Sequence, residues 1–526
     1  MISREGRREY ECMSQDHSNA SLSILKLPAI VTGLFERANR PLLPGLKGPS
    51  ELFVRYLRRK PGRGLAVIYN VDEVKRGRRK YSNDLHRSVS LTLDEQALEG
   101  AYIRFSETQA QQASVAIQPS GVVRAEDLGL SVQAFPADNS LPALAASCDT
   151  TQQSLLLQDL QTAARQQLGD QDWQLVSATA VPVRYKPANR CVIRYSLSLE
   201  HLSEKTSSHK NVTIFGKVYT DPQQALEVQS LQQKLYQEQL ATQGCKVVGH
   251  ILDLPLLPQP LGMNKILGLT FNEAVQPANP EELLRLGGRV LRPRMECGRG
   301  GEITNVIVPT EELGLTAIAL ARLHTSTVQP HESTPRTGAK EAKRARERAL
   351  LIAASNPTQA EVVQRLAQQL AARLETQQPD VYRSAHGGFK ASQLLFHSHR
   401  VFVVDFDGFC LADSALDVGY FLAYLRPSGL WYSRSGMRQW FEASAEVFSS
   451  TYRQAMLELG STRATVDSIL ERSRLYEAAL LFKIATRRVN RLNSPRPQEL
   501  SEMLKEIAVC LSAESGRSYG YLLNHG

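Results

Sequence analysis

The stretch HGGFKASQLLFHSHRVFVVDFDG, residues 386–408, differs from the sequence around it. It contains two short apolar runs, at 393–396 and 401–405, joined by a polar turn, whereas the flanking residues have helical periodicity. We therefore expect a β-hairpin with polar side chains at both strand ends, facing one pocket. Such a pocket suits phosphates and a divalent metal.

Three polar residues of this stretch are candidate metal ligands. Asp405 and the side-chain amide of Gln393 offer hard oxygen atoms. Magnesium prefers such ligands and takes only one or two carboxylates from protein. Asp407 could share the metal with Asp405, or it could cap the following turn. The sequence leaves both roles of Asp407 open.

Around this stretch the chain resembles the aminoglycoside phosphotransferase family, small-molecule kinases with a protein-kinase-like fold. The family's catalytic loop reads H-G-D-x-x-x-x-N, and its metal motif reads hydrophobic-D-[FW]-[DEG]. Here an eight-residue loop begins with HG at His386, and Asp405 follows nineteen positions later. ARLH at 321–324 is similar to the family's A-x-L-H signature, and DSALDV at 413–418 to its D-P-A-x-D-L-A segment. The resemblance covers about residues 176–492.

The resemblance implies that ATP and magnesium bind between the two lobes of a kinase-like fold. Lys217, in the strand GKVY, would contact the ATP phosphates and pair with Glu227 of the following helix, with Glu238 as the competitor. In the catalytic loop, His386 would brace the backbone. Lys390 matches a lysine that faces the γ-phosphate in many protein kinases, and a surface lysine is the alternative.

Two residues near these motifs are expected to have structural roles. Asp417 resembles a family aspartate that hydrogen-bonds to the catalytic loop. His324 is expected to satisfy the carbonyl groups at the end of its helix. Neither residue is expected to touch ligand.

Two positions depart from the family's pattern. Gln393 replaces the metal-binding asparagine, a mild change because glutamine offers the same amide oxygen one methylene further out. Gly388 replaces the catalytic aspartate, so no side chain there can accept the proton of an acceptor hydroxyl. A positioned general base contributes about 10²–10⁴-fold in rate, although the loose transition state of phosphoryl transfer leaves the base less to do. We expect transfer to be slowed but not abolished.

Three functions are therefore considered. The first is transfer of the ATP γ-phosphate to a hydroxyl of a small molecule, weakened by the absence of the general base. The alternative is a catalytically inactive pseudokinase, a nucleotide sensor or scaffold with a protein partner. The third is polyanion binding, because 62 Lys+Arg against 53 Asp+Glu give a net charge of +9, densest at 75–80 and 340–348. No reader motif accompanies this charge, so nucleic acid is not an expected partner.

Length and composition set the broad class of the protein. At roughly 150 residues per domain, the 526 residues predict about three structural units. With 42% apolar and 22% charged residues, neither a disordered chain nor a membrane protein fits. The seven cysteines are scattered singly without zinc spacing and read as reduced thiols. No signal-peptide or membrane-span pattern is present, so the expected location is cytoplasmic.

Two segments, 51–69 and 183–199, have the pattern of a β-hairpin with a proline in the turn. Four residues of the first match four of the second at an offset of 126, which suggests a repeated β lobe; two unrelated hairpins are the alternative. The matched residues are Arg58, Lys60, Pro61 and Tyr69 with Arg184, Lys186, Pro187 and Tyr195.

We predict an α+β fold: a two-lobed protein-kinase-like fold, with a small β-rich N-lobe and a helical C-lobe, preceded by an additional α+β domain. The expected divisions are a partly disordered extension (1–45), an α+β domain that a duplication would make a degenerate N-lobe copy (46–150), the N-lobe (151–275) and the C-lobe (276–526). Helices are expected at 223–235, 312–324, 339–354, 359–376, 437–459, 464–492 and 499–512.

Overall fold

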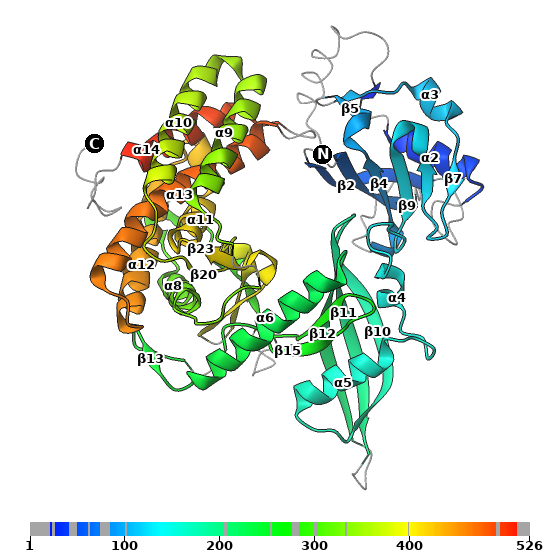
Figure 1. The fold of residues 1–526 in the computed structure, drawn as a ribbon, viewed down its shortest axis with the longest axis horizontal. Coiled ribbons are helices and arrows are strands. Elements are labelled where there is room, and N and C mark those ends of the chain that lie inside the picture. The colour runs from blue at the N-terminus through cyan, green and yellow to red at the C-terminus, as the bar shows by residue number, and fades with distance from the viewer. Residues whose placement is uncertain are drawn as a thin grey trace. The chain divides into compact units, whose positions relative to one another are not determined.

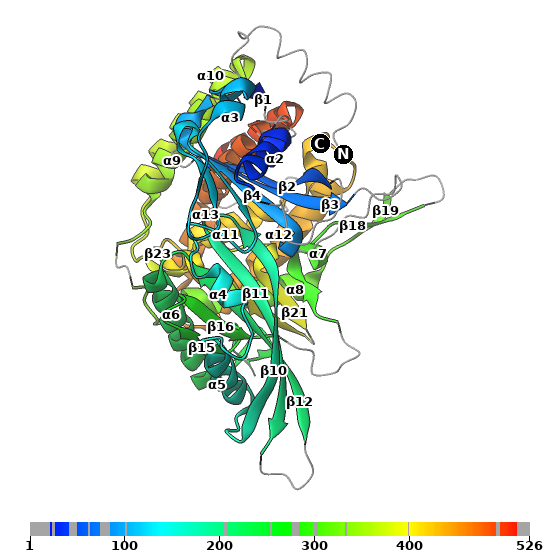
Figure 2. The ribbon, with the colours of Figure 1, turned by 90° about the vertical axis from the view of Figure 1, so that its right-hand side faces the viewer.

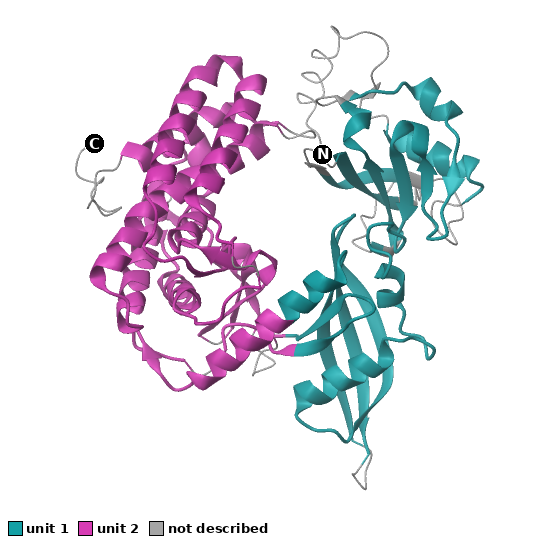
Figure 3. Cartoon of the chain, in the orientation of Figure 1, with its two compact units in different colours: residues 1–229, 261–274, 492–494 teal, residues 230–260, 275–491, 495–526 magenta. Residues whose placement is uncertain are grey.

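The chain divides into two compact units in a computed structural model (Figure 3). Unit 1 comprises residues 1–229, 261–274 and 492–494, and unit 2 comprises 230–260, 275–491 and 495–526. The structure describes residues 22–23, 27–40, 50–60, 64–73, 85–99, 102–202, 208–252, 255–275, 283–298, 303–331, 334–397, 399–490 and 495–512. Most of the predicted extension 1–45 and the basic stretch 75–80 lie outside these residues.

The N-terminal part of unit 1 is built on a six-stranded antiparallel sheet in the order β2–β3–β4–β9–β8–β7. Its buried face, with Val67, Leu91 and Val132, packs in one core with Leu34 of helix α2 (Leu27–Arg37). The sheet strands are β2 (Ser50–Lys60), β3 (Gly64–Glu73), β4 (Ser88–Leu93), β7 (Ala116–Ile117), β8 (Val123–Ala125) and β9 (Leu130–Ala134). Around it lie β1 (Leu22–Ser23), β5 (Leu98–Glu99), β6 (Tyr102–Ile103), α3 (Glu107–Gln112) and α4 (Leu144–Cys148).

The second part of unit 1 is a five-stranded sheet in the order β10–β11–β12–β16–β15. Figures 1 and 2 show helix α5 (Leu157–Leu168) along its long strands. The helix buries Leu160 and Ala164 in one core with Ile193 and Tyr195 of the sheet. The strands are β10 (Trp173–Lys186), β11 (Arg190–His201), β12 (His209–Tyr219), β15 (Pro260–Asn264) and β16 (Leu269–Glu273). Helix α6 (Pro222–Ala241), longer than predicted, runs from unit 1 into unit 2.

Both predicted hairpins of unit 1 are confirmed, as β2–β3 and β10–β11. Their registers agree at the offset of 126, because Lys60 pairs with Gly64 in the first and Lys186 with Arg190 in the second. The matched residue Tyr195 is fully buried, as is its counterpart in β3. This agreement supports a duplicated β lobe, which stays a proposal.

Unit 2 is mainly helical, and its large core joins several helices through residues such as Leu320, Phe421, Phe448 and Leu480. Its helices are α7 (Gly287–Val290), α8 (Thr310–His324), α9 (Gly338–Ser355), α10 (Ala360–Thr376), α11 (Ala415–Leu425), α12 (Met437–Glu458), α13 (Arg463–Val489) and α14 (Leu500–Ser512). Its short strands are β13 (Lys246–Val247), β14 (His250–Ile251), β17 (Arg285–Leu286), β18 (Arg294–Cys297), β19 (Ile303–Ile307), β20 (Arg383–Ala385), β21 (Leu394–His397), β22 (Arg400–Val403) and β23 (Cys410–Ala412).

The predicted helices of unit 2 are confirmed. They were predictable because their apolar residues have clear helical spacing. In α10, for example, Val363, Leu366, Leu370 and Leu374 recur at intervals of three or four residues, and all are buried. The α+β class is confirmed by the β-rich unit 1 and the helical unit 2. Among the described residues, no helix is both long enough and apolar enough to cross a membrane.

Candidate active site

Two loops of unit 2 are held side by side by short strand pairs. The first loop, 386–393, lies between β20 and β21, and the second, 404–409, lies between β22 and β23. Strand β20 pairs with β23, and β21 pairs with β22. Each loop therefore connects one of these strand pairs to the other. The Val404 N–H also donates to the Gln393 carbonyl at 2.9 Å. The predicted hairpin is confirmed, and its polar strand ends meet.

The two loops lie close together at Gly387. Its φ is 73°, a left-handed conformation that glycine adopts without steric cost. A Cβ at this position would lie 2.0 Å from the Gly408 carbonyl oxygen. Only a residue without a side chain fits here, so the family's H-G pair has a physical reason in this chain.

Asp417, in the first turn of α11, fixes the first loop on both sides of Gly388. Its carboxylate accepts hydrogen bonds from the N–H groups of Gly387, at 3.2 Å, and Phe389, at 3.3 Å. Burial alone would raise the pKa of Asp417, but the nearby His324 and His386 and the Phe389 N–H lower it below its usual value. The predicted structural role of Asp417 is confirmed.

His324 has a different role from the predicted one. At the end of α8, its Nδ1 is 2.8 Å from the Tyr452 hydroxyl, and its Nε2 is 3.7 Å from an Asp417 oxygen. The ring is fully buried. The prediction that it satisfies helix carbonyls was wrong, because tertiary packing offers it a hydroxyl and a carboxylate instead.

His386 joins the two loops. Its Nε2 is 3.2 Å from the Val404 carbonyl oxygen, and its ring packs against Phe389 and Phe406. Burial lowers the pKa of His386, although Asp417 opposes the effect. A neutral ring whose Nε2 faces a carbonyl must carry its proton on Nε2. The geometry therefore fits a loop brace, the role that the resemblance implies for His386.

Gly388 and Lys390 occupy the part of the first loop where chemistry was predicted. A Cβ built on Gly388 meets no heavy atom within 4 Å, and its backbone is not left-handed. The Lys390 Nζ lies 5.7 Å from the centre of the Tyr424 ring of α11. The space beside Gly388 is therefore open, and the cation at 390 is held against an aromatic face.

The predicted metal ligands lie on both loops. Asp405 has φ 72° and ψ 55°, an uncommon conformation for a residue other than glycine, and such outliers cluster at functional sites. Among the described residues, the Gln393 Oε1 is a buried oxygen without a hydrogen-bond partner. An unpartnered amide oxygen and a carboxylate on a residue with a left-handed backbone fit a hard divalent cation. Asp407 follows in the short helical turn 406–408 and is half-buried.

The predicted phosphate-contacting residues lie in unit 1. Lys217 lies on β12, where it pairs with Val192 and Thr270 of the neighbouring strands. Its Nζ is 5.2 Å from the centre of the Tyr219 ring. Glu227 lies on α6 and accepts a hydrogen bond from Gln223 at 3.1 Å. The competitor Glu238 binds Ser326 and Thr327 in unit 2, through contacts that occupy both of its carboxylate oxygens.

Arg336 is a residue of this site that the sequence did not reveal. Its Nη1 donates to the Gly387 carbonyl at 2.7 Å, its Nη2 to the Tyr420 hydroxyl at 2.6 Å, and its Nε to Glu341 at 2.8 Å. With Asp417 on the Gly387 N–H, both polar groups of that residue's backbone are bound by charged side chains. Arg336 lies 51 residues before Gly387 in a segment without a motif, so no signal could have found it.

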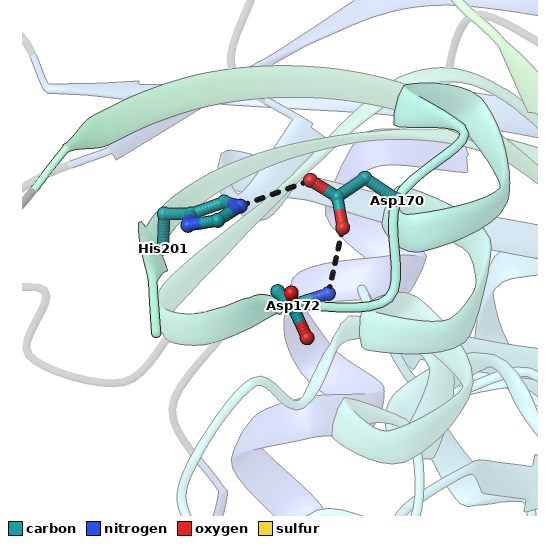
Figure 4. Close-up of side chains that lie close together, drawn as sticks. All are labelled: Asp170, Asp172 and His201. Atoms are coloured by element: carbon teal, nitrogen blue, oxygen red, sulfur yellow. Dashed lines mark hydrogen bonds and ion pairs between the residues drawn. The ribbon is translucent and has the colours of Figure 1, made fainter. Parts of the chain in front are cut away.

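Unit 1 contains a separate group of possible ligand atoms, shown in Figure 4. The His201 Nε2 lies 2.9 Å from Asp170, and the Asp172 N–H donates to the other Asp170 oxygen at 2.9 Å. The backbone N–H of Asp172 and then His201 lower the pKa of Asp170. An ion pair and a turn hydrogen bond account for this arrangement, and we assign it no ligand.

Comparison with known proteins identifies the segment that contains both loops. Residues 217–452 match the phosphotransferase enzyme family. The match covers less than half of the 526-residue chain. The match includes every predicted site residue from Lys217 to Asp407, and it confirms the resemblance and the kinase-like fold class. No curated protein matches the chain.

Solved structures of several kinases are similar to the chain. A glucosamine kinase is 14% identical over 92% of this chain and 95% of its own, with a TM-score of 0.39. A choline/ethanolamine kinase family protein from Mesorhizobium loti is 11% identical over 60% and 85%, with a TM-score of 0.36. A macrolide 2'-phosphotransferase from Brachybacterium faecium is 12% identical over 68% and 100%, with a TM-score of 0.32. Because these TM-scores lie below 0.5, they carry no conclusion about activity.

Proposed function

We propose that this protein is a magnesium-dependent phosphotransferase that moves the γ-phosphate of ATP to a hydroxyl group of a small molecule. The observation that carries the proposal is the meeting of loops 386–393 and 404–409 within the phosphotransferase segment. They place Gln393 and the strained Asp405 at adjoining strand ends. The family match supports phosphotransfer, and these residues support a site for the metal.

Asp405 and Gln393 would hold the metal, with Asp407 as a further carboxylate. Magnesium, when bound, would offset the negative charge of the nucleotide phosphates. The Gln393 backbone is tied to Val404, and its buried amide oxygen has no hydrogen-bond partner among the described residues, so it is available to a metal. Lys217 would contact the ATP phosphates from β12, with Glu227 orienting its ammonium group.

The remaining residues would position the loop and balance charge. Asp417 and Arg336 hold the peptide groups around Gly388, and neutral His386 ties the loop to Val404. Lys390 would neutralise charge that develops on the transferred group, as preorganised cations do in other enzymes. The acceptor proton would leave to solvent, because residue 388 has no side chain. Transfer would therefore be slow.

The glycine at 388 favours a second candidate, a pseudokinase that binds nucleotide without transferring phosphate. The two loops are otherwise intact, and the space beside Gly388 is open. Such a protein would bind ATP and magnesium with the same residues and act through a protein partner. Both candidates share the nucleotide site and differ in turnover.

An ADP-release assay separates the candidates. The purified chain is incubated with magnesium, ATP and a panel of amino alcohols and amino sugars, and acceptor-dependent ADP release is followed. The phosphotransferase proposal expects release that Asp405→Ala removes and that Asp467→Ala retains, since Asp467 is an exposed partner of Arg453. Turnover that survives Asp405→Ala would overturn the assignment. ATP binding without turnover for any acceptor would favour the pseudokinase.

A further inference from the structure

Basic side chains gather near Tyr420, Glu341 and Lys483 in unit 2, and no role was assigned to most of them above. They come from helices α9 and α13 and from the segment just before α9. We name this group the basic cluster; it consists of Arg336, Arg344, Arg348, Lys483 and Arg487. The Arg336 Cζ lies 5.2 Å, and the Lys483 Nζ 5.7 Å, from the centre of the buried Tyr420 ring.

The acid within the basic cluster is Glu341, and its charge is already shared. The fully buried carboxylate accepts from Arg336 at 2.8 Å and also contacts Arg344. The Tyr420 hydroxyl donates to its other oxygen at 3.1 Å. Burial raises the pKa of Tyr420 well above its usual value, so the phenol is neutral. One carboxylate therefore serves two arginines, and the other cations need another partner.

The remaining cations of the cluster are Arg348, Lys483 and Arg487. In the described part of the chain, none of the three forms an ion pair with a carboxylate. Within the described residues, Arg348 donates to the Ala479 carbonyl at 3.2 Å and to no carboxylate. Arg348 and Lys483 are half-buried, whereas Arg487 is exposed. Three cations, two of them half-buried, thus lack a carboxylate partner among the described residues.

The neighbouring positive charges disfavour the protonated form of Lys483. Burial first, and then Arg487, Arg348 and Arg336, lower its pKa to about 7, and Glu341 opposes them weakly. Besides Arg336, the charged and titratable groups near Lys483 come from three helices. Helix α9 carries Glu341, Arg344 and Arg348, α11 carries the neutral Tyr420, and α13 carries Arg487. Burial also lowers the pKa of Arg348. An anion among these groups would favour their charged forms.

The basic cluster is also joined to the candidate active site. Arg336 stacks on Tyr420 and donates to the Gly387 carbonyl at 2.7 Å. One guanidinium group therefore contacts both the centre of the cluster and the loop that carries Gly388. A ligand bound here would be separated from that loop by one side chain, that of Arg336.

We propose that the basic cluster binds a small tetrahedral anion, a phosphate ion or the phosphate group of an organic monoester, through Arg348, Lys483 and Arg487. Arginine and lysine donors in a partly desolvated site suit this ligand. The proposal goes beyond phosphotransfer and does not rest on it. Binding can therefore be measured whether or not the chain turns over ATP.

The test is calorimetric titration of the full chain without nucleotide. Inorganic phosphate and glycerol 3-phosphate are the probes. Tighter binding of the first would indicate a site for the free phosphate ion, and tighter binding of the second a site for an organic phosphate monoester. We expect Lys483→Met and Arg348→Met each to weaken binding by about tenfold or more, the usual loss for a charge-assisted hydrogen bond. Arg346→Met is the matched control on α9, because Arg346 pairs with Glu375 on the exposed face. Lys505→Met, paired with Glu502, is the lysine control.

Folding and pH provide independent readouts. Lys483→Met removes a partly desolvated cation, so its melting temperature without ligand should equal or exceed that of the wild type, and the stabilisation by phosphate should be lost. Sulfate keeps its charge over the pH range of interest. Its binding should weaken as pH rises from 6 to 8.5, because Lys483 loses its proton near pH 7, and this change should be smaller in Lys483→Met. No binding of either phosphate probe at millimolar concentration, or equal weakening in the control variants, would overturn the proposal.

Discussion

Replacing Gly388 with aspartate should restore the group that the catalytic loop lacks. The structure accommodates the change, because the Gly388 Cβ position is free of heavy atoms within 4 Å and its φ is not positive. Asp417 holds the N–H groups on either side of residue 388, so the new side chain need not disturb the backbone. The new carboxylate would project into the open space beside the loop.

The expected gain follows from the role of a general base. A positioned base contributes about 10²–10⁴-fold, which corresponds to about 2.7–5.4 kcal/mol of activation free energy. The lower end applies here, since the transition state of phosphoryl transfer is loose and demands little from the base. We therefore expect Gly388→Asp to raise kcat by about a hundredfold, with an unchanged affinity for ATP.

The assay is acceptor-dependent ADP release under saturating magnesium and ATP, with kcat and KM measured separately. Gly388→Asn is the matched control, because its side chain has nearly the same size and cannot accept the proton. Gly388→Ala tests whether the loop tolerates a side chain at all. A gain below tenfold in a folded, ATP-binding Gly388→Asp variant would refute the reasoning, as would an equal gain in Gly388→Asn.

Three further predictions concern the stability of the site. Gly387→Ala should lower the free energy of unfolding by more than about 2 kcal/mol, since a left-handed alanine costs roughly 1–2 kcal/mol and its Cβ would also clash with the second loop. Asp417→Asn should cost about 2 kcal/mol by leaving a buried N–H, that of Gly387 or Phe389, without an acceptor. Glu341→Ala should cost about 3–5 kcal/mol by leaving Arg336 without its buried partner. Urea unfolding measures all three.

Two control variants and the pH dependence of stability test these predictions further. Gly388→Ala and Asp467→Asn should each change stability by less than about 0.5 kcal/mol, as surface substitutions do. Burial would raise the pKa of Glu341, but Arg336 and Arg344 lower it to about 2 in the folded state. Its ionised form therefore contributes stability above about pH 4, the range of an unfolded glutamate, and this contribution is lost as pH falls toward 2. The stability difference between the wild type and Glu341→Ala should therefore shrink below pH 4. A difference that stays constant below pH 4 would contradict the assignment.

The parts of the fold that were predictable are those specified by local pattern. Helix α10 and the hairpin β10–β11 follow from apolar spacing and from a turn at Pro187, and the structure contains both. The two-loop site was also predictable, because its residues lie within one continuous stretch around His386. Short-range spacing carried this information.

Contacts between distant segments could not be predicted. Arg336 reaches Gly387 across 51 residues, and the pairing of His324 with Tyr452 spans 128. A buried histidine takes whatever partner packing provides, so the helix-end rule failed for His324. Arg348 lies in the basic stretch 340–348 that the sequence shows, but its proximity to Lys483 exists only in the folded chain.

The most direct test of the proposed function is calorimetric titration of the purified protein with ATP, with and without magnesium, beside Asp405→Ala and the control Asp467→Ala. The proposed site predicts binding that requires magnesium, that Asp405→Ala loses and that Asp467→Ala retains. Absence of binding at millimolar ATP, or equal binding by Asp405→Ala, would contradict the nucleotide site on which both candidate functions depend.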